Sequence, residues 1–99
     1  MMVRIPIDSD RIGEFCRRNR ISRLAFFGSV LRDDFGPDSD VDVLVEFESG
    51  ARVGFFSMAR MQDELSAIVG RPVDLCTPKS LSRYFRDRVV REAEAAYVA

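Results

Sequence analysis

Three aspartates lie in or beside apolar segments, where carboxylates are unusual. Asp40 and Asp42 flank a valine at the start of VDVLVEF, and Asp74 lies inside PVDLC. Residues two apart in a strand point to the same face, so Asp40 and Asp42 share one, with their bases roughly 6 to 7 Å apart. Two such carboxylates repel each other. A divalent cation bound between them turns this repulsion into a net attraction. Oxygen ligands of this kind suit hard cations such as Mg²⁺.

The chain contains no histidine, which excludes the kinds of catalysis and metal binding that need an imidazole. Histidine acid–base catalysis, Ser-His-Asp triads and His-ligated zinc are all excluded. If the segment with Asp74 lies next to the strand with Asp42, then Asp40, Asp42 and Asp74 form one cluster. Three carboxylates can hold two divalent ions about 3.5 to 4 Å apart, as in phosphoryl and nucleotidyl transfer. The alternatives are a solvated strand edge for Asp40 and Asp42, and a salt bridge to an arginine such as Arg71 for Asp74.

A glycine-serine pair stands ten residues before the D-x-D pattern, directly after the apolar run LAFF. Gly28 lets a ligand approach the backbone closely. A short helix beginning at Ser29 would present free N–H groups to a phosphate. The alternative is an ordinary helix cap at the end of a strand. Arg32 lies one turn later, where it could reach a phosphate or pair with a carboxylate of the motif.

The stretch GSVLRDDFGPDSDVDVLVEF resembles the motif of the polymerase-beta-like nucleotidyltransferases. The closer resemblance is to the minimal nucleotidyltransferases, small proteins encoded beside HEPN-domain proteins and called MNT or MntA antitoxins. It spans the first strand, the motif, the following helix and the PVDL segment. One departure is Arg32-Asp33, where many relatives carry Arg-Gly.

The resemblance implies a catalytic set of Asp40, Asp42 and Asp74, with Gly28, Ser29 and Arg32 around the nucleotide phosphates. Asp40 and Asp42 would ligate Mg²⁺, two ions in all, with Mn²⁺ as the other candidate metal. Asp74 would be a further metal ligand or the base toward the incoming hydroxyl. The implied reaction is AMPylation: ATP donates AMP to a tyrosine hydroxyl of a cognate HEPN ribonuclease toxin, and pyrophosphate leaves. The chain would then be an antitoxin in a hetero-oligomer with that toxin.

Two other functions stay open. The chain could be a non-catalytic antitoxin that silences its partner by binding and occlusion. It could also be a nucleotidyltransferase that acts on a small molecule or RNA, although 99 residues leave little surface for a separate acceptor pocket.

The elements that must position these residues follow from periodicity and from turn residues. Strands are expected at 24–27, 41–47 and 73–76, with a short helix or turn at 29–34 and a polar turn at 48–54. Helices are expected at 8–20, capped by Asp8 or Ser9, and at 55–69, ended by Gly70. A final helix, capped by Thr77 or Ser80, would carry the apolar stripe Leu81, Phe85, Val89, Ala93 and Ala96. Residues 1–99 would form one α+β domain, a mixed sheet with helices packed mainly on one face.

Composition restricts the partners. The net charge of −1 gives no general drive toward nucleic acid or an anionic membrane, so neither is expected as a partner. The chain has no apolar run of membrane-spanning length and no apolar signal core at its N-terminus, which suggests a cytoplasmic protein. Cys16 and Cys76 are expected to be buried, reduced thiols.

The remaining charged and aromatic residues have ordinary interpretations. Asp33, Asp34 and Asp38 suit surface turns. The two tyrosines, Tyr84 and Tyr97, are expected at the rim of the core. A basic set would form a solvated face of the final helix, or would meet an acidic partner: Lys79, Arg83, Arg86, Arg88 and Arg91.

Overall fold

The protein is built on a four-stranded mixed sheet with the strand order β3-β2-β1-β4. This computed structural model describes residues 3, 5–33 and 35–99. The central pair, β1 (Ile21–Phe27) and β2 (Val41–Phe47), is antiparallel. On the outer sides, β4 (Glu94–Val98) runs antiparallel to β1, and β3 (Val73–Cys76) runs parallel to β2. The expected mixed sheet is therefore present, with a fourth strand that the sequence analysis did not include.

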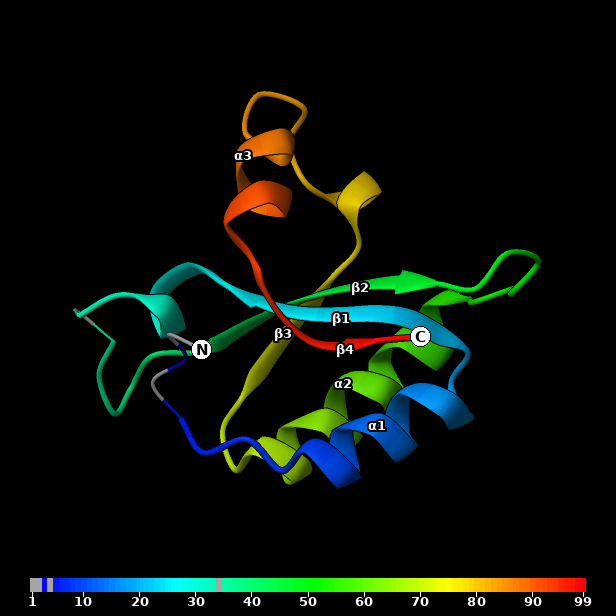
Figure 1. Ribbon diagram of the computed structural model, residues 1–99, viewed down its shortest axis with the longest axis horizontal. Helices are drawn as coiled ribbons and strands as arrows, with labels where there is room; N and C mark the ends of the chain where they lie inside the picture. The colour runs from blue at the N-terminus through cyan, green and yellow to red at the C-terminus, as the bar shows by residue number, and fades with distance from the viewer. Residues whose placement is uncertain (1–2, 4, 34) are drawn as a thin grey trace.

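Two helices, α1 (Ser9–Arg18) and α2 (Phe55–Val69), lie side by side on one face of this sheet (Figure 1). The Asp8 side chain caps α1 by accepting the N–H of Arg11 at 3.2 Å, as expected. Gly70 ends α2 in the left-handed conformation, with φ of 76°. An ion pair between Arg18 and Glu64 joins the two helices. The expectation that helices pack mainly on one face is confirmed.

The core fills the space between this helical layer and the sheet. Along β2, Val41, Val43 and Val45 are fully buried, and the residues between them point to the opposite face. Alternation along one strand thus sends apolar side chains into the core and sends Asp42 away from α1 and α2. The helices and other strands supply the rest of the cluster, including Ile12, Phe15, Cys16, Leu24, Phe26, Met61, Leu65, Val73 and Leu75.

The C-terminal segment differs from the expected long helix. Thr77 precedes a short 3₁₀ helix, η2 (Pro78–Ser80), and α3 (Arg86–Glu92) follows on the side of the sheet away from α1 and α2 (Figure 1). Residues 94–98 then return as β4. The long final helix was therefore a wrong prediction, because the open edge of β1 offers these residues backbone hydrogen bonds that override their helical propensity.

Two aromatic assignments in this segment also change. Tyr97, in β4, is half-buried against the core, as expected. Tyr84 is 85% exposed and Phe85 is 45% exposed, so neither belongs to the core or its rim. Of the basic set, Lys79 lies in η2 and Arg83 in a turn, so this set does not form one helix face. No described helix is long and apolar enough to cross a membrane.

Candidate active site

Asp42 and Asp74 occupy paired positions on neighbouring strands. In the parallel β2–β3 register, Asp42 lies opposite Asp74, and in the antiparallel β1–β2 register it lies opposite Phe27. Paired residues on adjacent strands point to the same face of the sheet. Both carboxylates therefore lie on the face away from α1 and α2. The condition that the sequence analysis set for an acidic cluster, a strand with Asp74 next to β2, is therefore met.

The pKa of Asp42 reports which charges surround it. Burial raises this pKa above its usual 3.8, and the nearby carboxylates of Asp74 and Asp40 raise it further. The positive charge of Arg32 acts in the opposite direction. Asp42 is half-buried, whereas Asp40 and Asp74 are exposed. The three aspartates and Arg32 thus share one electrostatic neighbourhood, centred on the least solvated carboxylate.

Arg71, the alternative partner proposed for Asp74, is held elsewhere. Its guanidinium lies over the ring of Phe35, 4.3 Å from the ring centroid. It also donates a hydrogen bond to the carbonyl of Gly36 at 2.5 Å. Arg71 therefore fixes the loop that leads into β2 and leaves Asp74 beside Asp42.

The acidic set fits a hard divalent cation by its chemistry, because all its donors are carboxylate oxygens and their mutual repulsion favours binding of positive charge. As they stand, no three Asp, Glu or Cys side chains among residues 3, 5–33 and 35–99 come close enough together to hold a metal ion. Side chains of like charge spread apart, and Asp40 and Asp74 are exposed enough to turn toward a cation.

Gly28 makes room for the Asp42 carboxylate. A Cβ atom at residue 28 would lie 2.3 Å from Oδ2 of Asp42 and 3.2 Å from its Cγ. Gly28 also has φ of +75°, which disfavours any other residue. The sequence analysis assigned this glycine to the approach of a ligand. The structure adds that a side chain at residue 28 would collide with the Asp42 carboxylate.

Ser29 does not have the helix-capping position expected for it. The helix there is the four-residue 3₁₀ element η1 (Gly28–Leu31), and its N-cap is Phe27. Ser29 lies inside η1, with its hydroxyl 3.5 Å from the backbone carbonyl of Asp40. Ser29 therefore borders the acidic set directly, and the capping prediction was wrong.

Two further aspartates of the motif, Asp33 and Asp38, lie outside the strands that carry this cluster. Asp33 and Asp38 are exposed in the connection between η1 and β2, as expected for turn residues. Asp34 lies outside the described residues.

Two polar residues of α2 position the strand that carries Asp74, and the sequence analysis missed both. Gln62 accepts the N–H of Leu75 through its side-chain oxygen at 3.0 Å, and Ser66 accepts the N–H of Val73 through its hydroxyl at 3.0 Å. These bonds satisfy the outer edge of β3, which is an edge strand of the sheet formed by the described residues. The available signal was a glutamine and a serine one helical turn apart, next to the apolar stripe of α2.

Cys76 lies near the acidic set. Burial raises the pKa of its thiol to about 11, and the negative charges of Asp74 and Asp42 contribute. Burial also raises the pKa of Cys16 to about 12. Both cysteines are free thiols, Cys16 buried and Cys76 half-buried, so the expected reduced state is confirmed and full burial holds only for Cys16.

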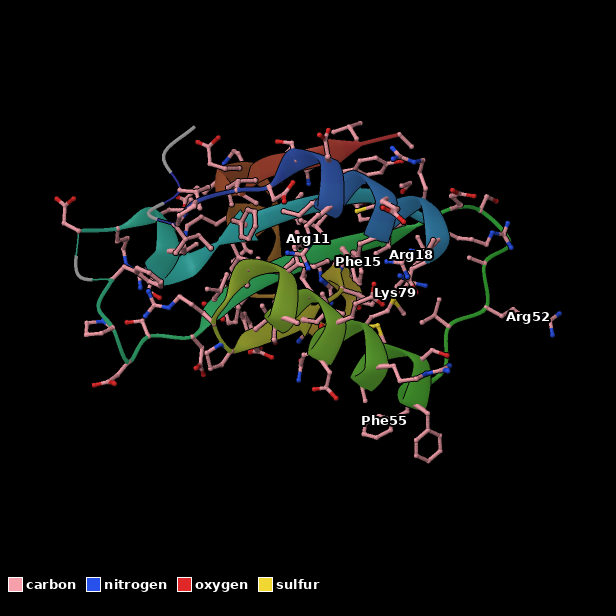
Figure 2. All side chains as sticks on the ribbon, turned by 90° about the horizontal axis from the view of Figure 1, so that it is seen from below. Arg11, Phe15, Arg18, Arg52, Phe55 and Lys79 are labelled. Carbon is pink, nitrogen blue, oxygen red and sulfur yellow. The ribbon has the colours of Figure 1, made fainter. Side chains whose placement is uncertain are left out.

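An apolar cavity lies beside α2, lined by residues other than the three aspartates. It has a volume of about 370 Å³ between α2, β3 and η2, and its lining includes Phe55, Met58 and Leu75. Phe55 projects away from the protein at the start of α2 and is 82% exposed (Figure 2). None of the acidic residues of the set lines this cavity.

One family of known proteins matches most of this chain. Residues 10–98 match the family described as "Nucleotidyltransferase domain". The chain belongs to this family. It is 33% identical over 76 residues to "Putative protein adenylyltransferase MJ0435" of Methanocaldococcus jannaschii, which covers 77% of this chain and 80% of that protein. It is also 33% identical over 79 residues to protein adenylyltransferase MntA of Thermococcus cleftensis, covering 80% of this chain and 78% of that one.

Two solved structures share the fold of this chain. A structure described as "putative minimal nucleotidyltransferase" superposes with a TM-score of 0.70 at 34% identity, over 86% of this chain and 85% of that chain. A toxin–antitoxin crystal structure with AMP-PNP gives a TM-score of 0.74 at 19% identity, over 94% of this chain and 75% of that chain. The mixed sheet with its helical layer is therefore the fold of minimal nucleotidyltransferases.

Proposed function

We propose that this chain is an antitoxin that transfers AMP from ATP to a tyrosine hydroxyl of a partner HEPN ribonuclease and releases pyrophosphate. The observation that carries the proposal is the pairing of Asp42 with Asp74 across β2 and β3, with Gly28 keeping the space beside Asp42 open. A half-buried carboxylate that is repelled by two others is a poor structural element and a good cation ligand.

The donor and the acceptor are supported by the relatives. Two of them are named protein adenylyltransferases, which makes AMP the transferred group and a protein the acceptor. One structural neighbour is a toxin–antitoxin complex with the ATP analogue AMP-PNP. Another is described as a tri-AMPylated HEPN toxin from Shewanella oneidensis in complex with an MNT antitoxin. For this chain, ATP and a HEPN protein are the corresponding proposals.

The residues of the site have separate roles in this reaction. Asp40, Asp42 and Asp74 would hold Mg²⁺, which supplies positive charge against the triphosphate and the developing negative charge of the transition state. Gly28 and Ser29 would border the phosphates where η1 meets β2. Arg32, whose charge already acts on Asp42, would hold the triphosphate chain in line. Asp74 is exposed beside Asp42 and would accept the proton of the attacking hydroxyl.

A binding function is the second candidate, and one surface feature favours it. Phe55 and Phe56 are 82% and 83% exposed and touch edge to face, with ring centroids 5.9 Å apart. Large apolar side chains displayed together commonly mark a protein contact. A partner held there could be silenced by occlusion without any transfer of AMP. In both cases the chain would form a hetero-oligomer with its partner.

Intact mass spectrometry of the HEPN partner separates the two functions. The partner is incubated with this protein, Mg²⁺ and each nucleoside triphosphate in turn, with Asp42→Asn as the control. Asparagine keeps the shape of the side chain but removes a ligand charge. A mass increase by whole AMP units with ATP, absent with Asp42→Asn, supports the enzyme. A stable complex without any mass change in the partner would refute catalysis and leave occlusion.

A further inference from the structure

The loop between η2 and α3 displays a tyrosine on the same side of the sheet as the acidic set. Asp42 and Asp74 point away from α1 and α2, and α3 rises on that same side (Figure 1). Tyr84 lies in the turn that precedes α3 and is 85% exposed. Burial of a large aromatic side chain stabilises a fold, so the display of this ring to solvent gives up stability.

Several hydrogen bonds hold the turn that carries Tyr84. The Ser82 hydroxyl accepts the N–H of Tyr84 at 3.3 Å, and the Ser82 carbonyl accepts the N–H of Phe85 at 3.2 Å and that of Arg86 at 2.9 Å. The Arg86 guanidinium donates to the carbonyl of Leu81 at 3.0 Å. These bonds fix the backbone on both sides of Tyr84 and leave its ring in water.

The guanidinium group of Arg83 lies beside the phenol of Tyr84. The guanidinium of Arg83 lies 5.3 Å from the centroid of the Tyr84 ring, and its Nη2 lies 3.5 Å from the phenolic oxygen. A positive charge in that position favours the negative charge that develops on the oxygen as its proton leaves. The segment from Lys79 to Glu92 contains five basic residues against two acidic ones, which attracts the triphosphate of a nucleotide toward it.

We propose that Tyr84 is a self-modification site, which the chain's own nucleotidyltransferase activity adenylylates with ATP. This inference rests on the proposed function. The phenolic oxygen of Tyr84 attacks the α-phosphorus of ATP and forms a new O–P bond. The bond from that phosphorus to the bridging oxygen breaks, and pyrophosphate leaves. The phenolic proton passes to the carboxylate of Asp74.

Tyr97 provides a matched internal control, since the chain has only these two tyrosines. It lies in β4, pairs with Leu24 of β1 and packs against the core, so its hydroxyl has far less freedom to reach a nucleotide. Tyr84→Phe removes only one exposed oxygen and leaves the fold intact. Neither tyrosine belongs to the proposed catalytic set.

The test is intact and peptide mass spectrometry of the purified protein with Mg²⁺ and ATP, run beside the same protein with its HEPN partner. We expect one AMP unit on the chain, localised to Tyr84, reduced at least tenfold by Tyr84→Phe, unchanged by Tyr97→Phe and absent with Asp42→Asn. AMP on the partner with an unmodified Tyr84 would overturn self-modification and leave the proposed function standing. AMP on neither protein would overturn both.

Discussion

Replacing Gly28 with alanine should separate catalysis from folding in this protein. The new Cβ would lie 2.3 Å from Oδ2 of Asp42, a distance that no real contact of this kind tolerates. The carboxylate is the free end of a side chain, so it can swing away by about 1 Å at little cost in stability. A displacement of about 1 Å at a reacting centre can lower the rate about 100-fold. We therefore expect Gly28→Ala to lose about 100-fold in the rate of AMP transfer.

Gly70 offers a closely matched control for the backbone effect. Its φ is +76°, against +75° for Gly28, and a Cβ at residue 70 would meet nothing within 4 Å. An L-residue in the left-handed region costs about 1 to 2 kcal/mol. Alanine also lowers the conformational entropy of the unfolded chain, which stabilises the folded state by about 0.4 to 1 kcal/mol. Both variants should thus lose about 1 kcal/mol of unfolding free energy, which lowers Tm by about 4 to 8 °C in a domain of this size.

The assay compares the two alanine variants at a temperature where circular dichroism shows both to be folded. Transfer of AMP to the partner is followed by mass spectrometry or by pyrophosphate release. In an Asp42→Asn background, Gly28→Ala should cause no further loss, because the two changes disable the same carboxylate. If Gly28→Ala transferred AMP as fast as Gly70→Ala, the contact between Gly28 and Asp42 would have no part in catalysis and the reasoning would be refuted.

Three further predictions concern charge, thiols and the strand edge. Because burial and neighbouring carboxylates raise the pKa of Asp42 above 3.8, charging it costs folding free energy, and the cost develops as the pH rises from 3.8 through its folded pKa. Asp42→Asn should therefore melt above the wild type at pH 7, with the gain vanishing below about pH 3.8 in thermal melts. With thiol pKa values of about 12 and 11, Cys16 and Cys76 should resist alkylation at pH 8 until the protein is denatured, which thiol titration checks. Gln62→Ala leaves the N–H of Leu75 without its acceptor and should cost about 1 kcal/mol in urea unfolding, whereas a loss near zero would show that water replaces the bond.

Local pattern was sufficient for the elements that carry the chemistry. The alternation in VDVLVEF predicted β2 to the residue, and Gly70 marked the end of α2. The strand at 73–76 was also predicted correctly, although it is only four residues long. In these segments the hydrophobic period, the turn residues and the tertiary structure all favour the same conformation, so short-range information is enough.

The C-terminal third was predicted less well because its conformation depends on distant partners. The segment EAEAA has a high helical propensity, yet residues 94–98 form β4 beside β1. A strand needs a neighbour, and the availability of β1 is a property of the whole sheet rather than of the local sequence. The same error placed Tyr84 at the core rim instead of at an exposed turn.

The sequence by itself determined which candidate site residues this protein has. A D-x-D pair, a third aspartate in an apolar strand, a glycine-serine pair and the lack of histidine together predicted a site of carboxylates and a hard cation. Tertiary structure alone decided that Asp74 lies opposite Asp42, that Gly28 leaves space for one carboxylate, and that α2 holds the edge of β3. These features depend on strand order and on contacts between residues far apart in the chain. The packing, hydrogen bonding and repulsion that select them act only once the whole sheet has formed.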